Sequence, residues 1–234
     1  MKQVCASLLA GALVVGCATA PAPRSENDAV AAGGNAVLLF AARDTIQDEW
    51  QHLRLVGATE FKMAAMDERI AIRAVGRESA SGLIRRIRID TDRCRTIEWS
   101  WNVTKVQPDA DIREKAREDV AASLFLLFGD PGFLTDPQPV PTLRYVWASA
   151  HVAENAVIDN PYMPGVVRSV VVRSGARRAG EWITERRDIG ADFEAAFGHR
   201  PADGIHAVAL FTDNDQTGQP VEAYYEWARV LCAT

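Results

Sequence analysis

Apolar and polar residues alternate along most of the chain after residue 58. Alternation with a period of two is typical of a strand that buries one face. Over residues 96–103, Ile97 and Trp99 fall on one face of such a strand, and Glu98 and Ser100 fall on the other. The same reasoning predicts strands over residues 59–66, 69–75, 83–89, 96–103, 120–128, 143–147, 166–173, 182–188, 205–211 and 222–231.

Helical patterns are scarce in comparison. Residues 120–128 are nearly all apolar, which fits a central strand or a buried helix, and the turn residues that follow favour the strand. One short helix is predicted over residues 191–197, with Gly198 placed to end it. Strands and helices do not alternate often enough for a parallel α/β sheet. We therefore expect an all-β fold, a jelly-roll-like antiparallel β-sandwich with one short helix.

The first residues have the features of an export signal. Lys2 precedes an apolar run over residues 6–15, which is too short to cross a membrane but has the length of a signal-peptide core. The run ends in Val14-Val15-Gly16-Cys17, which resembles the lipobox of bacterial lipoproteins. We expect residues 1–17 to be a lipoprotein signal peptide ending at a lipidated Cys17. The alternative is an ordinary secretory signal that is cut after Ala18 or Ala20.

Lipid on Cys17 would place the protein in the cell envelope. By similarity to lipoprotein sorting, Ala18 after the cysteine favours the outer membrane, with the protein facing the periplasm. Residues 18–43 are rich in Ala, Pro, Gly and small polar residues and are expected to be a flexible tether, although residues 37–40 are apolar enough to form a first strand. Residues 44–234 are expected to form a single β-sandwich domain.

Composition and charge narrow the choice of function. Hydrophobic residues make up 48% of the chain, which is normal for a globular core, and the net charge of −5 argues against nucleic-acid binding. Of the four cysteines, Cys5 would leave with the signal and Cys17 would carry lipid. Cys94 and Cys232 then remain, either as a disulfide in an oxidising compartment or as two buried thiols.

Several separated segments resemble a known bacterial family, domain-of-unknown-function family 3047. These segments are Ile97-Glu98-Trp99-Ser100-Trp101, Glu118-Asp119-Val120-Ala121-Ala122-Ser123, Pro139-Val140-Pro141-Thr142-Leu143-Arg144-Tyr145-Val146-Trp147, Val166-Val167-Arg168-Ser169 and Thr212-Asp213-Asn214-Asp215-Gln216-Thr217-Gly218. The resemblance runs from Trp50 to Leu231. It implies one β-rich domain, and it brings no established activity, cofactor or catalytic residue. A looser similarity, through the Thr-Asp-x-Asp loop before a Tyr-rich strand, is to jelly-roll carbohydrate-binding modules.

The loop over residues 213–218 alternates oxygen-bearing side chains before a glycine. Such an arrangement is typical of a calcium loop, because oxygen ligands suit a hard cation. Tyr224 stands where an EF-hand would need its bidentate Glu, which excludes that motif. A calcium site could still use Asp213 and Asp215, with other ligands from elsewhere. The alternative is a hairpin loop in which Asp and Asn side chains cap their own backbone.

Other candidates are carboxylates, arginines and aromatic residues at strand spacing. Rings stack on sugar faces, and forked guanidinium donors bind hydroxyls or uronates. The polar row of Glu98, Ser100 and Asn102 is either a plain outer sheet face or the wall of a binding cleft. The expected ligand-binding residues are Glu98, Asp119, Arg144, Trp147, Arg168, Asp213, Asp215 and Tyr224.

Three functions fit these features. The leading hypothesis is an envelope lipoprotein that binds carbohydrate or a cell-envelope glycan through one face of the sandwich. The second is a glycan hydrolase or lyase that pairs Glu98 with Asp119 or Asp213, which requires two converging carboxyls, one of them with a raised pKa. The third is a non-enzymatic scaffold that binds another envelope protein.

Overall fold

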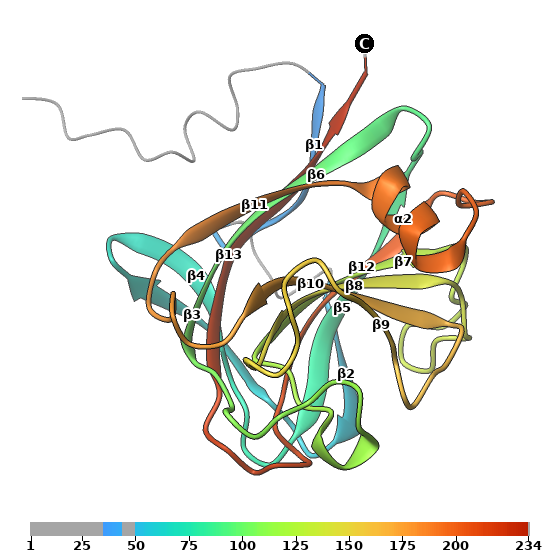
Figure 1. The fold of residues 1–234 in the computed structure, drawn as a ribbon. Helices are drawn as coiled ribbons and strands as arrows, with labels where there is room; N and C mark the ends of the chain where they lie inside the picture. The colour runs from blue at the N-terminus through green and yellow to red at the C-terminus, as the bar shows by residue number, and fades with distance from the viewer. Residues whose placement is uncertain (1–34, 44–49, 234) are drawn as a thin grey trace, which may run out of the picture. The chain divides into compact units, whose positions relative to one another are not determined.

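The computed structural model describes residues 35–43 and 50–233, which fold into two facing β-sheets (Figure 1). Sheet A has the strand order β11-β6-β13-β4-β3, and β1 pairs with β13. Its strands are β1 (Ala36–Ala41), β3 (Glu60–Met66), β4 (Arg69–Val75), β6 (Cys94–Lys105), β11 (Ile183–Asp188) and β13 (Glu222–Cys232). The expected all-β sandwich is confirmed.

Sheet B has the strand order β2-β5-β12-β7-β8-β10-β9. Its strands are β2 (Gln51–Val56), β5 (Ala80–Ile89), β7 (Ala122–Phe128), β8 (Thr142–Ala148), β9 (Val157–Asp159), β10 (Val167–Ser174) and β12 (Ile205–Asp213). The apolar run 120–128 is a strand in the structure, β7, and it lies between β8 and β12.

The core lies between the two sheets. From β6, Ile97, Trp99, Trp101 and Val103 all point inward and are at most 1% exposed. Trp99 packs on Tyr145 of β8, with ring centroids 5.0 Å apart, so the two sheets meet through large aromatic side chains. The polar residues Glu98, Ser100 and Asn102 of β6 therefore lie on the outer face of sheet A, which was one of the two positions expected for them.

One pair of strands departs from the antiparallel pattern. β10 runs parallel to β8, in a register that sets Val170 beside Tyr145. Parallel neighbours need a long crossover connection, because the chain must return to the end of the sheet at which the first strand began. Residues 149–166 provide this connection and contribute the short edge strand β9, which pairs with β10.

The helix α2 (Ile189–Phe197) begins two residues before the predicted start. The side chain of its N-cap, Asp188, accepts a hydrogen bond of 2.8 Å from the backbone N–H of Ala191. Gly198 ends the helix with φ 78°, a left-handed conformation that favours glycine. A short 3-10 helix, η1 (Lys115–Arg117), is the other helical element of the described residues.

The folded part starts earlier than the expected boundary at residue 44. β1 pairs with the second half of β13, and its Leu39 and Phe40 are buried in the core. The first strand expected over residues 37–40 is confirmed, and the expected tether is corrected over residues 36–41, because burial of Leu39 and Phe40 holds the segment against the sheet. The signal peptide and Cys17 lie outside the described residues. Within the described residues, none of the helices has the length and apolar character needed to cross a membrane.

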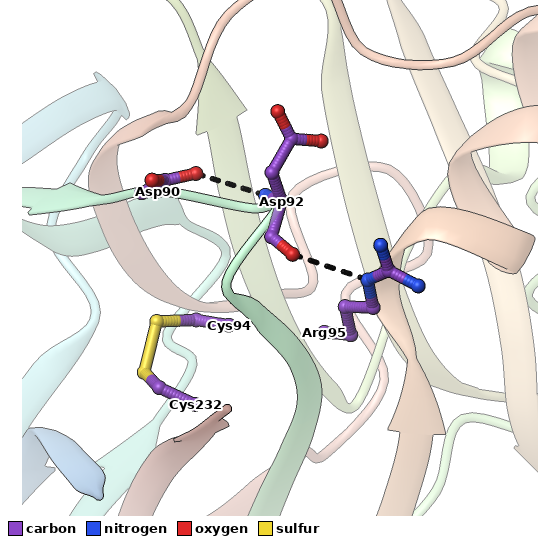
Figure 2. The surroundings of a disulfide bond; sticks show 5 residues. All are labelled: Asp90, Asp92, Cys94, Arg95 and Cys232. Atoms are coloured by element: carbon purple, nitrogen blue, oxygen red, sulfur yellow. Dashed lines mark hydrogen bonds between the residues drawn. A yellow bond between two sulfur atoms is a disulfide. The ribbon is translucent and has the colours of Figure 1, made fainter. Parts of the chain in front are cut away.

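Cys94 and Cys232 form a disulfide in the structure (Figure 2). The two cysteines lie opposite each other in β6 and β13, and 138 positions separate them in sequence. Asp90 supports the neighbouring turn, because its carboxylate accepts a hydrogen bond of 2.9 Å from the N–H of Asp92. The bond closes a large loop that holds most of both sheets.

Candidate functional site

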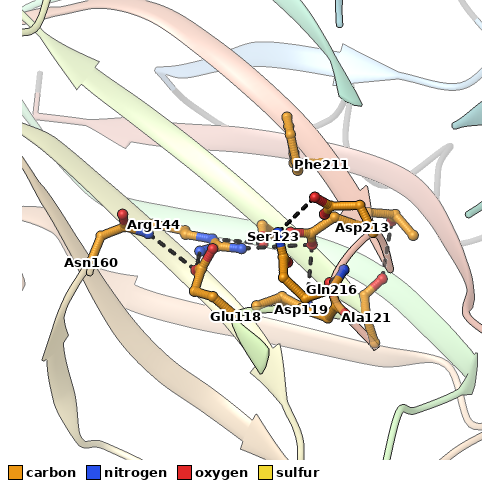
Figure 3. A network of polar contacts seen from close by, with 12 residues as sticks. Glu118, Asp119, Ala121, Ser123, Arg144, Asn160, Phe211, Asp213 and Gln216 are labelled. Carbon is orange, nitrogen blue, oxygen red and sulfur yellow. Dashed lines mark hydrogen bonds and ion pairs between the residues drawn. The ribbon is translucent and has the colours of Figure 1, made fainter. Parts of the chain in front are cut away.

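The residues expected to bind a ligand separate into three places. Asp119, Arg144 and Asp213 lie together on or beside the outer face of sheet B (Figure 3). Asp215 lies beside them, and Arg168 supports a neighbouring loop. Glu98 and Tyr224 lie on the outer face of sheet A. Trp147 lies in the core.

Arg144 is the centre of the group on sheet B. Leu143 and Tyr145 of β8 point into the core, so Arg144 between them points to the opposite face. Its guanidinium pairs with Glu118, donates a hydrogen bond of 3.0 Å to Ser123 Oγ, and lies 3.8 Å from Asp213 Oδ1. The residue is only 2% exposed. A buried guanidinium needs such partners, because an unpaired charge in the interior is strongly destabilising.

A loop explains why this outer face is buried. Ile112 and Val120, from the segment between β6 and β7, pack against Val146 of β8 and Val171 of β10. A second loop packs Leu134 on the other end of the same face. Arg144 lies between these two apolar clusters, and the ring of Phe125 lies 5.3 Å from its guanidinium carbon.

Three carboxylates converge beside Arg144. Asp119, Asp213 and Asp215 each offer one oxygen atom, and these atoms lie within 4.8 Å of one another. Asp119 accepts hydrogen bonds from the backbone N–H groups of Gln216 at 3.1 Å and Thr217 at 2.7 Å. Asp213 accepts one of 3.0 Å from Val120 N–H. Asp119 and Asp213 therefore join the 213–218 loop to the start of β7.

The 213–218 loop is not a hairpin loop, because it joins β12 of sheet B to β13 of sheet A, and the side chains of Asp213 and Asn214 accept from Val120 and Ser79 instead of from their own backbone. Asn214 Oδ1 accepts a hydrogen bond of 3.1 Å from Ser79 N–H, and Gly218 adopts a φ of 65° while its N–H bonds to Asn214 O. Asp119, Asp213 and Asp215 are the residues of this region that could hold a cation. Calcium at Asp213 and Asp215 stays a prediction, now with Asp119 as a third oxygen donor.

Burial changes the acidity of this cluster. It raises the pKa of Asp213 well above its ordinary value, by more than Arg144 lowers it. It also raises the pKa of Glu118, again more than Arg144 opposes. The pKa of Asp215 is raised by burial and by the charge of Asp119. Glu118 and Asp213 thus share one guanidinium, and a raised pKa is the expected result when like charges are desolvated together.

Glu118 also holds a surface loop in place. Its carboxylate accepts a hydrogen bond of 3.1 Å from Asn160 Nδ2. Asn160 Oδ1 in turn accepts from the N–H groups of Tyr162 and Met163, both at 2.9 Å. On the other side of the loop, Arg168 forms an ion pair of 3.1 Å with Asp159 (β9), whose other carboxylate oxygen accepts from Gly165 N–H at 2.9 Å.

The loop presents Tyr162, which is 51% exposed. Its hydroxyl donates a hydrogen bond of 2.7 Å to Lys115 O and accepts one of 3.4 Å from Gln216 Nε2. The Lys115 ammonium lies 5.4 Å from the ring centroid. Burial of the hydroxyl and the nearby charge of Asp215 raise the pKa of Tyr162.

Sequence reasoning did not select Tyr162, Lys115, Gln216 or Asn160 as site residues. The one available signal was Asn160 before Pro161, a pair typical of turns that an Asn side chain organises. The partners of Tyr162 come from two other loops, and a single sequence does not reveal such contacts.

Glu98 does not join this cluster. It lies on the outer face of sheet A, where its carboxylate pairs with Arg186 of β11 and Arg229 of β13. Tyr224 lies on the same face, and its hydroxyl donates a hydrogen bond of 3.1 Å to Glu222. The proposed pairing of Glu98 with Asp119 or Asp213 is therefore wrong, because the two sheets separate these carboxyls.

Trp147 is wrong as a ligand-binding residue. It is 1% exposed and lies between the sheets, with its ring centroid 6.1 Å from that of Trp101. Its indole N–H donates a hydrogen bond of 2.9 Å to Gly175 O. The alternation along β8 that turns Arg144 outward also turns Trp147 inward.

Carbohydrate-binding modules are among the structural neighbours of the chain. The Family 11 Carbohydrate-Binding Module of the cellulosomal cellulase Lic26A-Cel5E of Clostridium thermocellum has a TM-score of 0.45 and 8% identity, and the match covers 86% of this chain and 96% of the module. The CBM22-1 xylan-binding domain from Paenibacillus barcinonensis Xyn10C has a TM-score of 0.38 and 12% identity, and the match covers 87% of this chain and 100% of that domain.

An enzyme is also among the structural neighbours. The endoglucanase cel12A from Rhodothermus marinus has a TM-score of 0.44 and 11% identity, with 84% of this chain and 99% of the endoglucanase covered. No functionally curated protein matches the chain in sequence. The family model described as Protein of unknown function (DUF3047) matches residues 48–228, and the chain belongs to this family.

Proposed function

We propose that this protein binds carbohydrate, with Tyr162 as the aromatic platform of the site. The observation that carries the proposal is a half-exposed ring whose hydroxyl is fixed by Lys115 and Gln216. Aromatic rings offer a broad apolar surface, which suits the C–H face of a sugar. A ring that is already immobile loses little conformational entropy when a ligand stacks on it.

Polar groups lie beside the ring. Asp215 Oδ1 and Gln216 Oε1 are buried and have no hydrogen-bond partner within the described residues. Both are acceptors, so a sugar hydroxyl could reach them only if the 213–218 loop moves. The Lys115 ammonium provides three donors on the same side of the loop. A few directed polar groups next to an apolar surface are typical of small-ligand sites.

The buried network has a supporting role in this proposal. Arg144, Glu118 and Asn160 are all under 9% exposed, so they are poor candidates for direct contact with a sugar. They connect sheet B to the loop that carries Tyr162, and they hold the ring in its position. Rigid support of this kind is what keeps a binding residue in its productive geometry.

The biological ligand in this proposal is a cell-envelope glycan. Its basis is the lipoprotein-type signal at Cys17, which would confine the protein to the envelope. Retention at the membrane by lipid and binding of a glycan by the domain are separate properties. They are tested by separate experiments.

The test compares two exposed aromatic residues. Tyr162→Ala should weaken binding to the best saccharide of a glycan array by about tenfold or more, which corresponds to about 1.4 kcal/mol. Phe133→Ala is the matched control, because Phe133 is 83% exposed and lies in the loop between β7 and β8. Affinity electrophoresis or calorimetry with the same saccharide gives the two affinities.

Two results would contradict the proposal. One is the absence of saccharide binding by the wild-type protein, with calcium present and with it chelated. The other is an equal loss of affinity in both variants, since this would mean that the ring of Tyr162 contributes no more to binding than the exposed ring of Phe133. Thermal melts of both variants check that neither one is unfolded.

A second candidate function is glycan hydrolysis or elimination. The observation that favours it is the convergence of carboxyls with raised pKa values, as acid–base catalysis requires. Against it, Asp119 is fully bonded to the loop and Asp213 is 3% exposed. Release of new reducing ends from the bound glycan would favour the enzyme, and recovery of intact glycan would favour binding alone.

A further inference from the structure

The outer face of sheet A is rich in positive charge. The ion-paired cations of its strands are Lys62, Arg69, Arg73, Lys105, Arg186 and Arg229, and the carboxylates are Glu60, Glu98, Glu222 and Glu226. We call this set the basic face. It has two more cations than carboxylates, on a chain whose net charge is −5. The charge of this face therefore differs in sign from that of the whole protein.

The carboxylates of the basic face bridge pairs of cations. Glu98 lies between Arg186 and Arg229, with 2.7 Å to Arg229 Nη2. Glu222 lies between Arg73 at 2.6 Å and Lys105 at 3.6 Å.

Of the other two carboxylates, Glu60 also bridges two cations, and Glu226 bonds to one cation and one hydroxyl. Glu60 bridges Lys62 at 2.5 Å and Arg77 at 3.1 Å. Glu226 accepts from Arg69 at 2.9 Å and from Ser100 Oγ at 2.8 Å. Across the face, each carboxylate positions basic side chains in a defined arrangement.

Burial differs between the two kinds of group. The side chains of Glu98 and Glu226 are 10% and 4% exposed, whereas those of Arg186 and Lys105 are 62% and 57% exposed. The carboxylates thus lie at the base of the face and the cations reach out from it. A guanidinium has five N–H donors, and one carboxylate uses only part of them, so donors remain for an anion.

Aromatic rings lie among the cations. Trp182 and Tyr224 pack edge to face with ring centroids 6.5 Å apart, and the Arg69 guanidinium lies 5.2 Å from the Trp182 ring. The indole N–H of Trp182 is buried and has no hydrogen-bond partner within the described residues. Rings and guanidinium groups together can bind a chain that has both apolar C–H faces and negative charges.

We infer that the basic face binds an acidic polysaccharide, a chain of sugars that carry carboxylates. Arg186 of β11 and Arg229 of β13 lie level with Glu98, and Arg73 of β4 and Lys62 of β3 lie level with Asn102. These four cations form a diagonal line across sheet A, and Lys105 lies beside the line, where it shares Glu222 with Arg73. A linear polymer that follows this diagonal meets four positive charges.

This site is separate from the one proposed at Tyr162. It lies on the other sheet, and none of its cations belongs to the Arg144 network. The two sites also differ in chemistry. The Tyr162 platform suits a sugar of any charge, whereas the basic face requires an anion. Each proposal can fail without the other.

The test uses the full chain and polygalacturonate, with neutral dextran as the comparison. The double variant Lys105→Ala/Arg186→Ala removes two exposed cations and leaves Glu98 with Arg229 and Glu222 with Arg73. We expect at least a tenfold loss of polygalacturonate affinity. We also expect wild-type binding to weaken as salt rises from 50 to 300 mM, because salt screens exposed charges.

The matched control is Arg54→Ala/Arg88→Ala, which removes two exposed cations from sheet B. It should change the affinity less than twofold. Equal loss in both double variants, equal binding of dextran, or no binding at 50 mM salt would each overturn the inference. Tighter binding to anionic phospholipid vesicles or to DNA than to polygalacturonate would overturn the assignment to polysaccharide.

Discussion

A single buried arginine organises the candidate site. Arg144 pairs with Glu118, lies 3.8 Å from Asp213 Oδ1, and is bonded to Ser123. With only one guanidinium for several carboxyls, the group most isolated from solvent is held least well in its charged form. That group is Asp213, whose pKa burial raises well above the usual 3.8.

The raised pKa predicts a pH dependence of stability. A carboxyl whose pKa is higher in the folded than in the unfolded protein stabilises the fold below its unfolded value, and this contribution is lost as the pH rises through the folded pKa. Asp213→Asn keeps an oxygen for Val120 N–H but has no charge. From pH 4 to pH 8, the unfolding free energy of the variant should therefore rise relative to that of the wild type. Urea unfolding at each pH measures it.

Asp136→Asn is the control for this experiment, because Asp136 is an exposed carboxyl in the loop between β7 and β8. Its difference from the wild type should stay nearly constant over the same range. A difference for Asp213→Asn that stays constant or falls with pH would mean that Arg144 keeps Asp213 charged at all these pH values.

At the residue scale, the sequence identified which residue types form the candidate site better than it predicted where each side chain lies. Asp213, Asp119 and Arg144 were selected for their residue types, and the structure brings them together. Trp147 was placed in a site because its face could not be assigned, although the burial of Tyr145 decides it. Tyr162 was missed because its role depends on contacts with loops far away in sequence.

At the scale of elements, strands with one buried face were predictable, and the two edge strands of sheet B, β2 and β9, were not. β6, β4 and β13 follow the expected alternation, because the core accepts only one of their faces. β2 was not expected, since most of its side chains are exposed and no alternation results. The parallel pairing of β8 with β10 depends on contacts across a long crossover, which periodicity does not report.

The disulfide between β6 and β13 gives a prediction at this scale. Closing a loop of more than 100 residues restricts the unfolded chain, and removing such a bond typically costs 2–5 kcal/mol. Reduction of the wild-type protein should therefore lower Tm by about 5–15 °C, given about 2–4 °C for each kcal/mol in a domain of this size. Scanning calorimetry with and without reductant measures the change.

The double variant Cys94→Ala/Cys232→Ala serves as the reference. Its Tm should match that of the reduced wild type and should not respond to reductant. If the oxidised and reduced wild-type proteins melt at the same temperature, then the bond adds nothing to stability, and the hydrogen bonds between β6 and β13 suffice.

At the scale of the whole molecule, the sandwich agrees with the family, and the export signal stays a proposal. Cys17 lies outside the described residues, so its lipidation has to be tested in cells. Cys17→Ala should abolish incorporation of a labelled fatty acid and move the protein from the membrane to the soluble fraction. Lipid chains hold a protein to a bilayer by about 0.8 kcal/mol for each buried CH₂ group.

Cys5→Ala is a closely matched control, because this cysteine lies in the same segment but before the expected cleavage site. It should leave lipid incorporation unchanged. A Cys17→Ala protein that still carries lipid and stays with the membrane would show that the anchor, if any, is elsewhere. An unlabelled wild-type protein would contradict the lipobox interpretation itself.

The order of strands in the two sheets has a consequence for how the chain folds. β12 lies between β5 and β7, and β13 lies between β6 and β4, yet both come last in the chain. Until they are placed, five earlier strands, β1, β4, β5, β6 and β7, each lack a neighbour, and pairings so distant in sequence form slowly. Each folding molecule therefore has unpaired strand edges until these two strands are added, and such edges can pair with other chains.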